Sequence, residues 1–242
     1  MIIGGLQKNT LIDFPGKLAC TVFISGCNFF CPWCYSPELV LPEKIKKQPR
    51  ITEKEVFDFL ESRKGLLEGV VICGGEPSMN KDLPELIKKI KKMGFLVKLD
   101  TNGSNPEMLE KLIDKKLIDY VAMDIKTPLV FKSQILNPKS QKTPKSQIQK
   151  YEKEIKKSVE ILRKGKIDFE FRTTAVPTVN KKEDFLEIAK WIGGTNVKYY
   201  LQNFRPEKTI DSSFEKIKPY PEEWLISVKK EISPFFKICE IR

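Results

Sequence analysis

Apolar and polar positions in this chain follow two alternating periods from residue 18 onward. Short β-branched runs with the two-residue repeat of strands precede longer segments with the three-to-four-residue repeat of amphipathic helices. Residues 1–17 are predicted to be an extended lead-in with turns at Gly4-Gly5 and Pro15-Gly16. The predicted strands are residues 18–25, 69–73, 95–100, 119–124, 167–176, 197–201 and 235–241. The predicted helices are residues 52–64, 83–93, 148–164, 180–192 and 221–232, with another beginning at Asn105-Pro106.

Strands that alternate with helices indicate βαβ units and a parallel sheet. We therefore expect an α/β fold, namely a partial (β/α)6 TIM-like barrel of parallel strands with its helices outside. A barrel of this kind accommodates all of residues 1–242 as a single domain. Residues 132–150 interrupt the alternation and are rich in Ser, Lys, Gln and Pro, so they are predicted to form an exposed loop insertion.

Composition narrows the function classes. The chain is 40% hydrophobic and 31% charged, and its formal net charge is +11. It has no apolar run of membrane-spanning length and no secretory signal, so we expect a cytoplasmic protein without a membrane partner. Lysine on predicted helix faces explains most of the positive charge, and no nucleic-acid-binding module is present, so no nucleic-acid partner is expected. The absence of histidine excludes His-based acid–base catalysis and His-ligated metals.

Three of the six cysteines, Cys27, Cys31 and Cys34, follow the first predicted strand with the spacing C-x3-C-x2-C. Three thiolates so close in sequence can hold one metal or cluster. A [4Fe–4S] cluster usually takes four cysteines, so three would leave one iron open to another ligand. Zinc is the alternative, but a structural zinc site needs four ligands and no second cysteine pair is present. A non-catalytic iron–sulfur electron carrier and a zinc-containing nucleic-acid binder also remain as other classes.

Polar residues gather where the predicted strands end. Such positions lie at the carboxyl edge of a parallel sheet, where α/β proteins build their active sites. Glycines and aspartates there also serve in turns and helix caps, which is the alternative reading. Arg172 lies within a strand pattern, where an unpaired charge is costly, so it either points into the mouth of the sheet or pairs with an acid. The strand-end residues are Gly74, Gly75, Glu76, Asp100, Asp124, Lys126 and Gln202.

These motifs resemble the radical S-adenosylmethionine (SAM) superfamily, which combines C-x3-C-x2-C with a Gly-Gly-Glu-Pro sequence one strand later. The segments Asn9–Lys17, Asp100–Gly103 and Met123–Lys126 are similar to those of the activating enzymes of glycyl-radical enzymes. Within that group, the chain is most similar to the longer activating proteins of anaerobic ribonucleoside-triphosphate reductase. The resemblance covers nearly the whole chain apart from about residues 132–150.

The resemblance implies an oxidoreductase of anaerobic metabolism that uses a [4Fe–4S] cluster and SAM. Its partners would be a glycyl-radical enzyme, as protein substrate, and an electron donor such as flavodoxin or ferredoxin. Hydrogen-atom transfer needs no general base, so no catalytic side chain is expected. Other readings are an enzyme like 7-carboxy-7-deazaguanine synthase and a pyruvate formate-lyase-type activase. The latter has a histidine at the end of the sixth strand, where this chain has Gln202.

The resemblance also implies roles for individual residues. Cys27, Cys31 and Cys34 would hold the cluster, and Trp33 and Tyr35 would flank the adenine side of SAM. The backbone of Gly74, Gly75 and Glu76, with the Glu76 side chain, would face the methionine amino group. Asp100, Asp124 and Lys126 would line the polar end of SAM, and Gln202 would lie near its ribose. In related activases the aspartate pair also helps to hold a monovalent cation.

Overall fold

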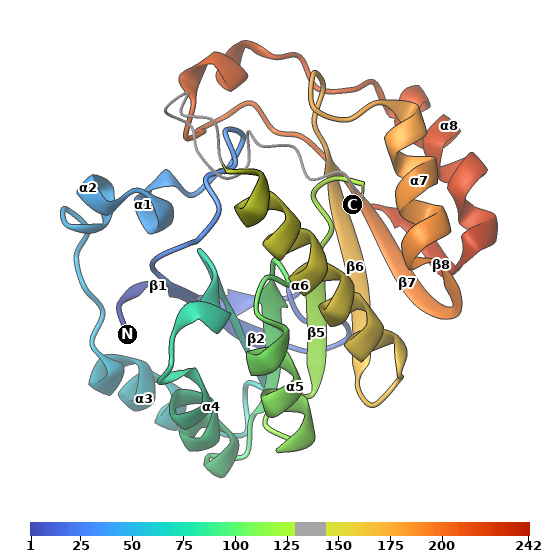
Figure 1. Ribbon diagram of the computed structural model, residues 1–242. Coiled ribbons are helices and arrows are strands. Elements are labelled where there is room, and N and C mark those ends of the chain that lie inside the picture. Colours follow the sequence, from blue (N-terminus) through green and yellow to red (C-terminus); the bar gives the residue numbers. More distant parts are fainter. Residues whose placement is uncertain (129–143) are drawn as a thin grey trace. The chain divides into compact units, whose positions relative to one another are not determined.

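A computed structural model describes residues 1–128 and 144–242, and its elements alternate as predicted (Figure 1). The strands are β1 (Ile3–Thr10), β2 (Ala19–Ile24), β3 (Gly69–Gly74), β4 (Leu96–Thr101), β5 (Tyr120–Asp124), β6 (Asp168–Ala175), β7 (Gly194–Asn203) and β8 (Phe236–Ile241). The α-helices are α1 (Pro37–Val40), α2 (Pro42–Ile45), α3 (Glu53–Glu61), α4 (Leu83–Lys92), α5 (Pro106–Asp114), α6 (Lys145–Arg163), α7 (Lys182–Ile192) and α8 (Glu222–Ile232). The 3-10 helices within the described residues are η1 (Pro77–Met79), η3 (Ser212–Lys216) and η4 (Ser233–Phe235). The strand order is the chain order, which confirms the α/β class expected of a partial TIM-like barrel.

The N-terminal lead-in differs from the prediction. Residues 3–10 form a complete strand, β1, that pairs antiparallel with β2. Gly4 and Gly5 lie inside this strand, so the turn predicted there is wrong. A Cβ at Gly4 would come within 2.4 Å of the Ser25 Oγ, so glycine lets the strand pass close to that side chain. The turn at Pro15-Gly16 is confirmed, with Gly16 at φ +69°. The short helices α1 and α2 were not predicted.

Two helix starts also differ from the prediction. Helix α6 begins at Lys145, directly after Pro144, so residues 145–150 of the predicted loop are helical. Residues 132–143 of that loop lie outside the described part of the chain. Helix α7 begins at Lys182, with Lys181 rather than Asn180 at its N-cap. The Asn180 Oδ1 instead accepts a hydrogen bond from the Val176 N–H, which stabilises the turn after β6.

The described residues form two compact units. The first contains residues 1–29, 36–101 and 107–121. Its strands β2, β3 and β4 are parallel, with Val22 opposite Ile72 and Ile72 opposite Leu99. Helix α4 contacts β4 and buries one apolar face, because its apolar side chains recur at helical spacing. A second apolar cluster contains Phe14, Ala19, Val71 and Tyr120.

The second unit contains residues 30–35, 102–106 and 122–242. Its strands β6, β7 and β8 are parallel, and α8 packs against β8 and α7. The Phe185 ring of α7 meets the Trp224 ring of α8 edge-on at 5.8 Å. Figure 1 shows α7 and α8 side by side next to β8.

A charged pair lies within the second unit. Glu170 of β6 is completely buried, and its Oε1 accepts a hydrogen bond of 2.9 Å from the Arg242 Nη1. The Arg242 guanidinium also lies 3.4 Å from the centre of the Tyr200 ring. A buried carboxylate is tolerated only when its charge is compensated, so Arg242 stabilises the β6–β7 sheet.

We expect Arg242→Met to lower the free energy of unfolding by about 3 kcal/mol, because it leaves the buried Glu170 charge without its guanidinium. Lys229→Met is the matched control, since Lys229 pairs with the exposed Glu240, and should cost less than about 1 kcal/mol. Adding Glu170→Gln to Arg242→Met should recover most of the loss. Urea unfolding measures all three variants, and equal losses for Arg242→Met and Lys229→Met would refute the assignment.

Candidate functional site

The first part of the cysteine loop belongs to the first unit. Strand β2 ends at Ile24, and Gly26 follows at φ +100°, a conformation that favours glycine. The Gly26 N–H donates to the Leu39 carbonyl oxygen at 2.7 Å, which fixes the path of the chain into Cys27. The Phe29 N–H then lies 3.3 Å from the Cys27 Sγ and donates to it. A backbone donor to sulfur is one of the contacts that tune cysteines holding iron–sulfur clusters.

The two other cysteines of the loop belong to the second unit. The Cys34 N–H donates to the Cys31 carbonyl oxygen at 2.9 Å, which makes a tight turn. Burial raises the pKa of the Cys31 thiol to about 12, although the Lys126 charge partly opposes this. A thiol must lose its proton to bind a metal, so metal binding would displace this proton. Among residues 1–128 and 144–242, no three Cys, Asp or Glu side chains are already gathered as a metal-binding group.

Aromatic contacts anchor the second part of the loop. The buried Trp33 ring lies 6.2 Å from the Phe214 ring, and the Tyr35 ring stacks on the Phe204 ring at 6.3 Å. The Tyr35 hydroxyl accepts a hydrogen bond of 3.0 Å from the Arg205 N–H. The segment after β7 therefore anchors Trp33 and Tyr35 of the cysteine loop, a long-range contact that the sequence did not predict. The roles of Trp33 and Tyr35 beside the adenine remain predictions.

Gly74, the last residue of β3, and Gly75 directly after it allow a close backbone approach. Gly74 has φ +123°, and a Cβ there would lie 2.2 Å from the Ile24 carbonyl oxygen. A Cβ at Gly75 would lie 2.1 Å from the carbonyl oxygen of Gly26. The N–H groups of Gly75 and Glu76 donate to these same two oxygens, each at 2.8 Å. The two glycines thus join the end of β3 directly to the start of the cysteine loop.

The Glu76 carboxylate is completely buried in the first unit. Its Oε1 accepts hydrogen bonds from the Ser78 N–H at 3.1 Å, the Ser78 hydroxyl at 2.5 Å and the Thr101 hydroxyl at 2.8 Å. Ser78 lies in η1 and Thr101 is the last residue of β4, and neither was predicted as a site residue from the sequence. These donors hold the Glu76 carboxylate in one orientation.

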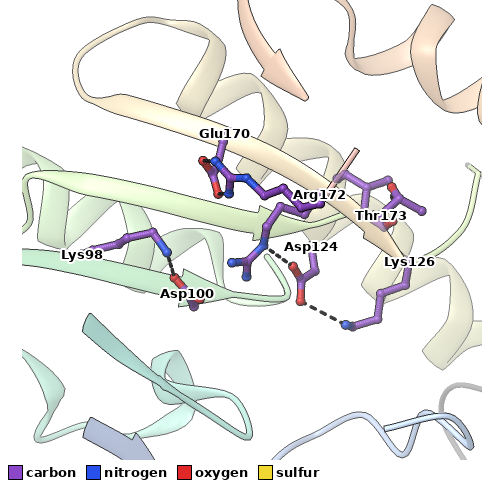
Figure 2. A network of polar contacts seen from close by, with 9 residues as sticks. Lys98, Asp100, Asp124, Lys126, Glu170, Arg172 and Thr173 are labelled. Carbon is purple, nitrogen blue, oxygen red and sulfur yellow. Dashed lines mark hydrogen bonds and ion pairs between the residues drawn. The ribbon is translucent and has the colours of Figure 1, made fainter. Parts of the chain in front are cut away.

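Asp100 at the end of β4 pairs with Lys98, two residues earlier on the same face of the strand (Figure 2). The Lys98 side chain is only 1% exposed and the Asp100 side chain 11%. Asp100 is among the site residues predicted from the sequence, and Lys98 is not. The signal was present, because a lysine within the apolar run Leu96-Val97-Lys98-Leu99 needs a compensating charge on the same strand face.

Asp124 at the end of β5 contacts two cations of the second unit (Figure 2). The Arg172 Nε donates to its Oδ1 at 2.9 Å, and the Lys126 Nζ lies 3.3 Å from its Oδ2. Arg172 therefore pairs with an acid, one of the two outcomes expected for it. Burial alone would raise the pKa of Asp124, but the Arg172 and Lys126 charges outweigh it and lower the pKa to about 2. The three side chains together carry one net positive charge.

Gln202 lies near the end of β7, opposite Thr174 of β6 and partly exposed. The next residue, Asn203, donates from its Nδ2 to the Tyr220 carbonyl oxygen at 2.9 Å, which ties the strand end to the segment before α8. The position at a strand end agrees with the sequence analysis. The contact of Gln202 with a ribose remains a prediction.

Comparison with known proteins assigns the family. Residues 21–192 match the model of the Radical SAM superfamily. A protein of Methanocaldococcus jannaschii, provisionally named a glycyl-radical enzyme activating enzyme, is 34% identical over 226 residues, which are 92% of this chain and 87% of that protein. A 7-carboxy-7-deazaguanine synthase of Aquifex aeolicus is 29% identical over 40% of each chain. The crystal structure of QueE from Escherichia coli shares the fold with a TM-score of 0.57 at 14% identity, covering 100% of this chain and 93% of that one.

The chain belongs to the radical SAM superfamily, whose members use a [4Fe–4S] cluster and SAM. Membership of this family confirms the prediction that the cofactors are a [4Fe–4S] cluster and SAM. The donor set fits it, because three thiols lie within one loop and the Cys27 Sγ already accepts a backbone hydrogen bond. Across the described residues, no helix is both long and apolar enough to cross a bilayer.

We expect the Asp124 pKa, followed by NMR of its carboxyl carbon, to be about 2 and to rise toward 3.8 in Arg172→Met. Lys126→Met should raise it less, because Arg172 is the stronger of the two lowering charges. The folded pKa lies below the unfolded value, so the stability from this group is complete above about pH 4 and is lost as the pH falls through 2. An Asp124 pKa that Arg172→Met leaves unchanged would contradict this account.

Proposed function

We propose that Cys27, Cys31 and Cys34 hold the [4Fe–4S] cluster, with the open iron available to SAM. The observation that carries this proposal is the C-x3-C-x2-C loop in a chain of the radical SAM superfamily. When bound, the cluster supplies one electron that cleaves SAM to methionine and a 5′-deoxyadenosyl radical, which can abstract a hydrogen atom.

The charged side chains of the chain would orient SAM. The net positive group of Asp124, Lys126 and Arg172 suits the carboxylate of the methionine moiety, because two cations outnumber one acid. The Glu76 carboxylate, which Ser78 and Thr101 orient, suits the ammonium group because it is an acid. Asp100 would line the same polar end of SAM. Trp33, Tyr35 and Gln202 are assigned to the adenosine part.

We propose that the hydrogen donor is a backbone glycine of a glycyl-radical enzyme, with anaerobic ribonucleoside-triphosphate reductase as the expected partner. The name of the M. jannaschii relative, which aligns over most of both chains, supports an activating role. No general base is required, because the step transfers a hydrogen atom. A flavodoxin or ferredoxin would supply the electron, and such an acidic carrier suits a chain with net charge +11.

A small-molecule substrate is the second candidate. The similarity to 7-carboxy-7-deazaguanine synthases favours it, although it covers only 40% of this chain in the A. aeolicus protein. A pyruvate formate-lyase-type role is less favoured, since the chain has no histidine to place where Gln202 lies.

The cluster assignment predicts a clear division among the cysteines. Cys27→Ala, Cys31→Ala and Cys34→Ala should each lose at least about ten-fold in bound iron and sulfide after anaerobic reconstitution, and should form no 5′-deoxyadenosine. Cys20→Ala is the matched control, because Cys20 is buried in β2 and its pKa is raised to about 12, so it should keep its iron. Zinc without sulfide in the wild-type protein, or full iron in Cys31→Ala, would overturn the assignment.

The activase assignment predicts a glycyl radical on the partner. Reconstituted protein mixed anaerobically with SAM, a reductant and anaerobic ribonucleoside-triphosphate reductase should give the electron paramagnetic resonance doublet of a glycyl radical. A partner in which the radical glycine is replaced by alanine should give none. Formation of 7-carboxy-7-deazaguanine, with no doublet on the partner, would instead support the small-molecule candidate.

A further inference from the structure

Both aspartates that the family resemblance links to a monovalent cation already have cationic partners within the chain. Asp100 pairs with Lys98 in the first unit, and Asp124 pairs with Lys126 and Arg172 in the second. Each carboxylate thus meets a fixed positive charge inside its own unit (Figure 2).

Lys98 supplies a fixed positive charge at Asp100. Its side chain is 1% exposed and lies on a strand whose neighbouring positions, Val97 and Leu99, are completely buried. An ammonium group so placed is tolerated only if a negative charge compensates it, and the Asp100 carboxylate lies within hydrogen-bonding distance. Because the lysine is anchored to the strand, its charge is present at Asp100 without any binding equilibrium.

The surroundings of Asp124 also disfavour a bound metal cation. Its two oxygens contact different cations, Arg172 at Oδ1 and Lys126 at Oδ2. A metal cation at this carboxylate would meet a group that already carries a net positive charge, and like charges repel.

We propose that the Lys98 ammonium takes the place of a bound monovalent cation at Asp100, so that this chain binds and cleaves SAM without added Na⁺ or K⁺. The part of this proposal that concerns SAM rests on the proposed function. The part that concerns Lys98 and Asp100 does not, because it is a property of the folded chain alone.

The first experiment compares salts on the wild-type protein. SAM cleavage by the reconstituted enzyme should agree within about two-fold in KCl, NaCl and choline chloride of equal ionic strength, since choline is too large to occupy a small cation site. The melting temperature of the protein without cluster should likewise be the same in KCl and in choline chloride. A ten-fold loss of cleavage in choline chloride, or a higher melting temperature in KCl alone, would overturn the proposal.

The second experiment tests whether a cation binds at Asp100 once the Lys98 ammonium group is removed. Lys98→Met removes the ammonium while keeping an unbranched side chain, which leaves the Asp100 carboxylate to recruit an ion. The melting temperature of this variant should be about 3 °C higher in KCl than in choline chloride, as expected when an ion binds only the folded state. Adding Asp100→Asn to Lys98→Met should abolish the difference.

Lys91→Met is the matched control, because Lys91 pairs with Asp119 at 2.7 Å elsewhere in the first unit. Its melting temperature should be equal in the two salts. An equal response in Lys98→Met and Lys91→Met would refute the assignment of Lys98. If Lys98→Met does not fold, the wild-type salt comparison decides the proposal. If no salt supports SAM cleavage, the proposed function fails, while the melting comparison still tests Lys98.

Discussion

The hydrogen bonds between the end of β3 and the start of the cysteine loop are the constraint on which the first part of the site depends. The N–H groups of Gly75 and Glu76 donate to Ile24 and Gly26, and only glycine fits this approach at residues 74 and 75. The same turn delivers the Glu76 carboxylate to Ser78 and Thr101. One local backbone arrangement therefore fixes where the chain enters Cys27 and how a buried carboxylate is oriented.

The second constraint is that each charge placed inside a strand needs a partner. Lys98 pairs with Asp100 on its own strand, and Arg172 pairs with Asp124 on the neighbouring strand. Glu170 pairs with Arg242, which follows β8. Burial makes each pair rigid, because separating its members would leave a charge without compensation. Rigid charges suit a site that must hold a zwitterionic ligand, since they need little reorganisation when the ligand binds.

The repeating part of the fold was predictable because its signals are local. Apolar periodicity located the strands from β2 onward, and the capping box of Thr52 and Glu55 located the start of α3. Strand β1 was missed because Gly4 and Gly5 are typical turn residues, and only their contacts with Ser25, Leu39 and Phe23 show why a strand needs them. The anchoring of Trp33 and Tyr35 could not be predicted, because their partners Phe214 and Phe204 are distant in sequence and periodicity does not connect such segments.

The pairing of the charged residues could be predicted only in part. Arg172 was recognised because an unpaired charge in a strand is costly, and pairing with an acid was one of the two predicted outcomes. The same reasoning applied to Lys98 would have indicated Asp100, since residues two apart on a strand share a face. Applied to Glu170 it would have required a cation without locating Arg242, which is distant in sequence. A charge at an apolar strand position thus predicts a partner reliably, and identifies that partner only when it is local.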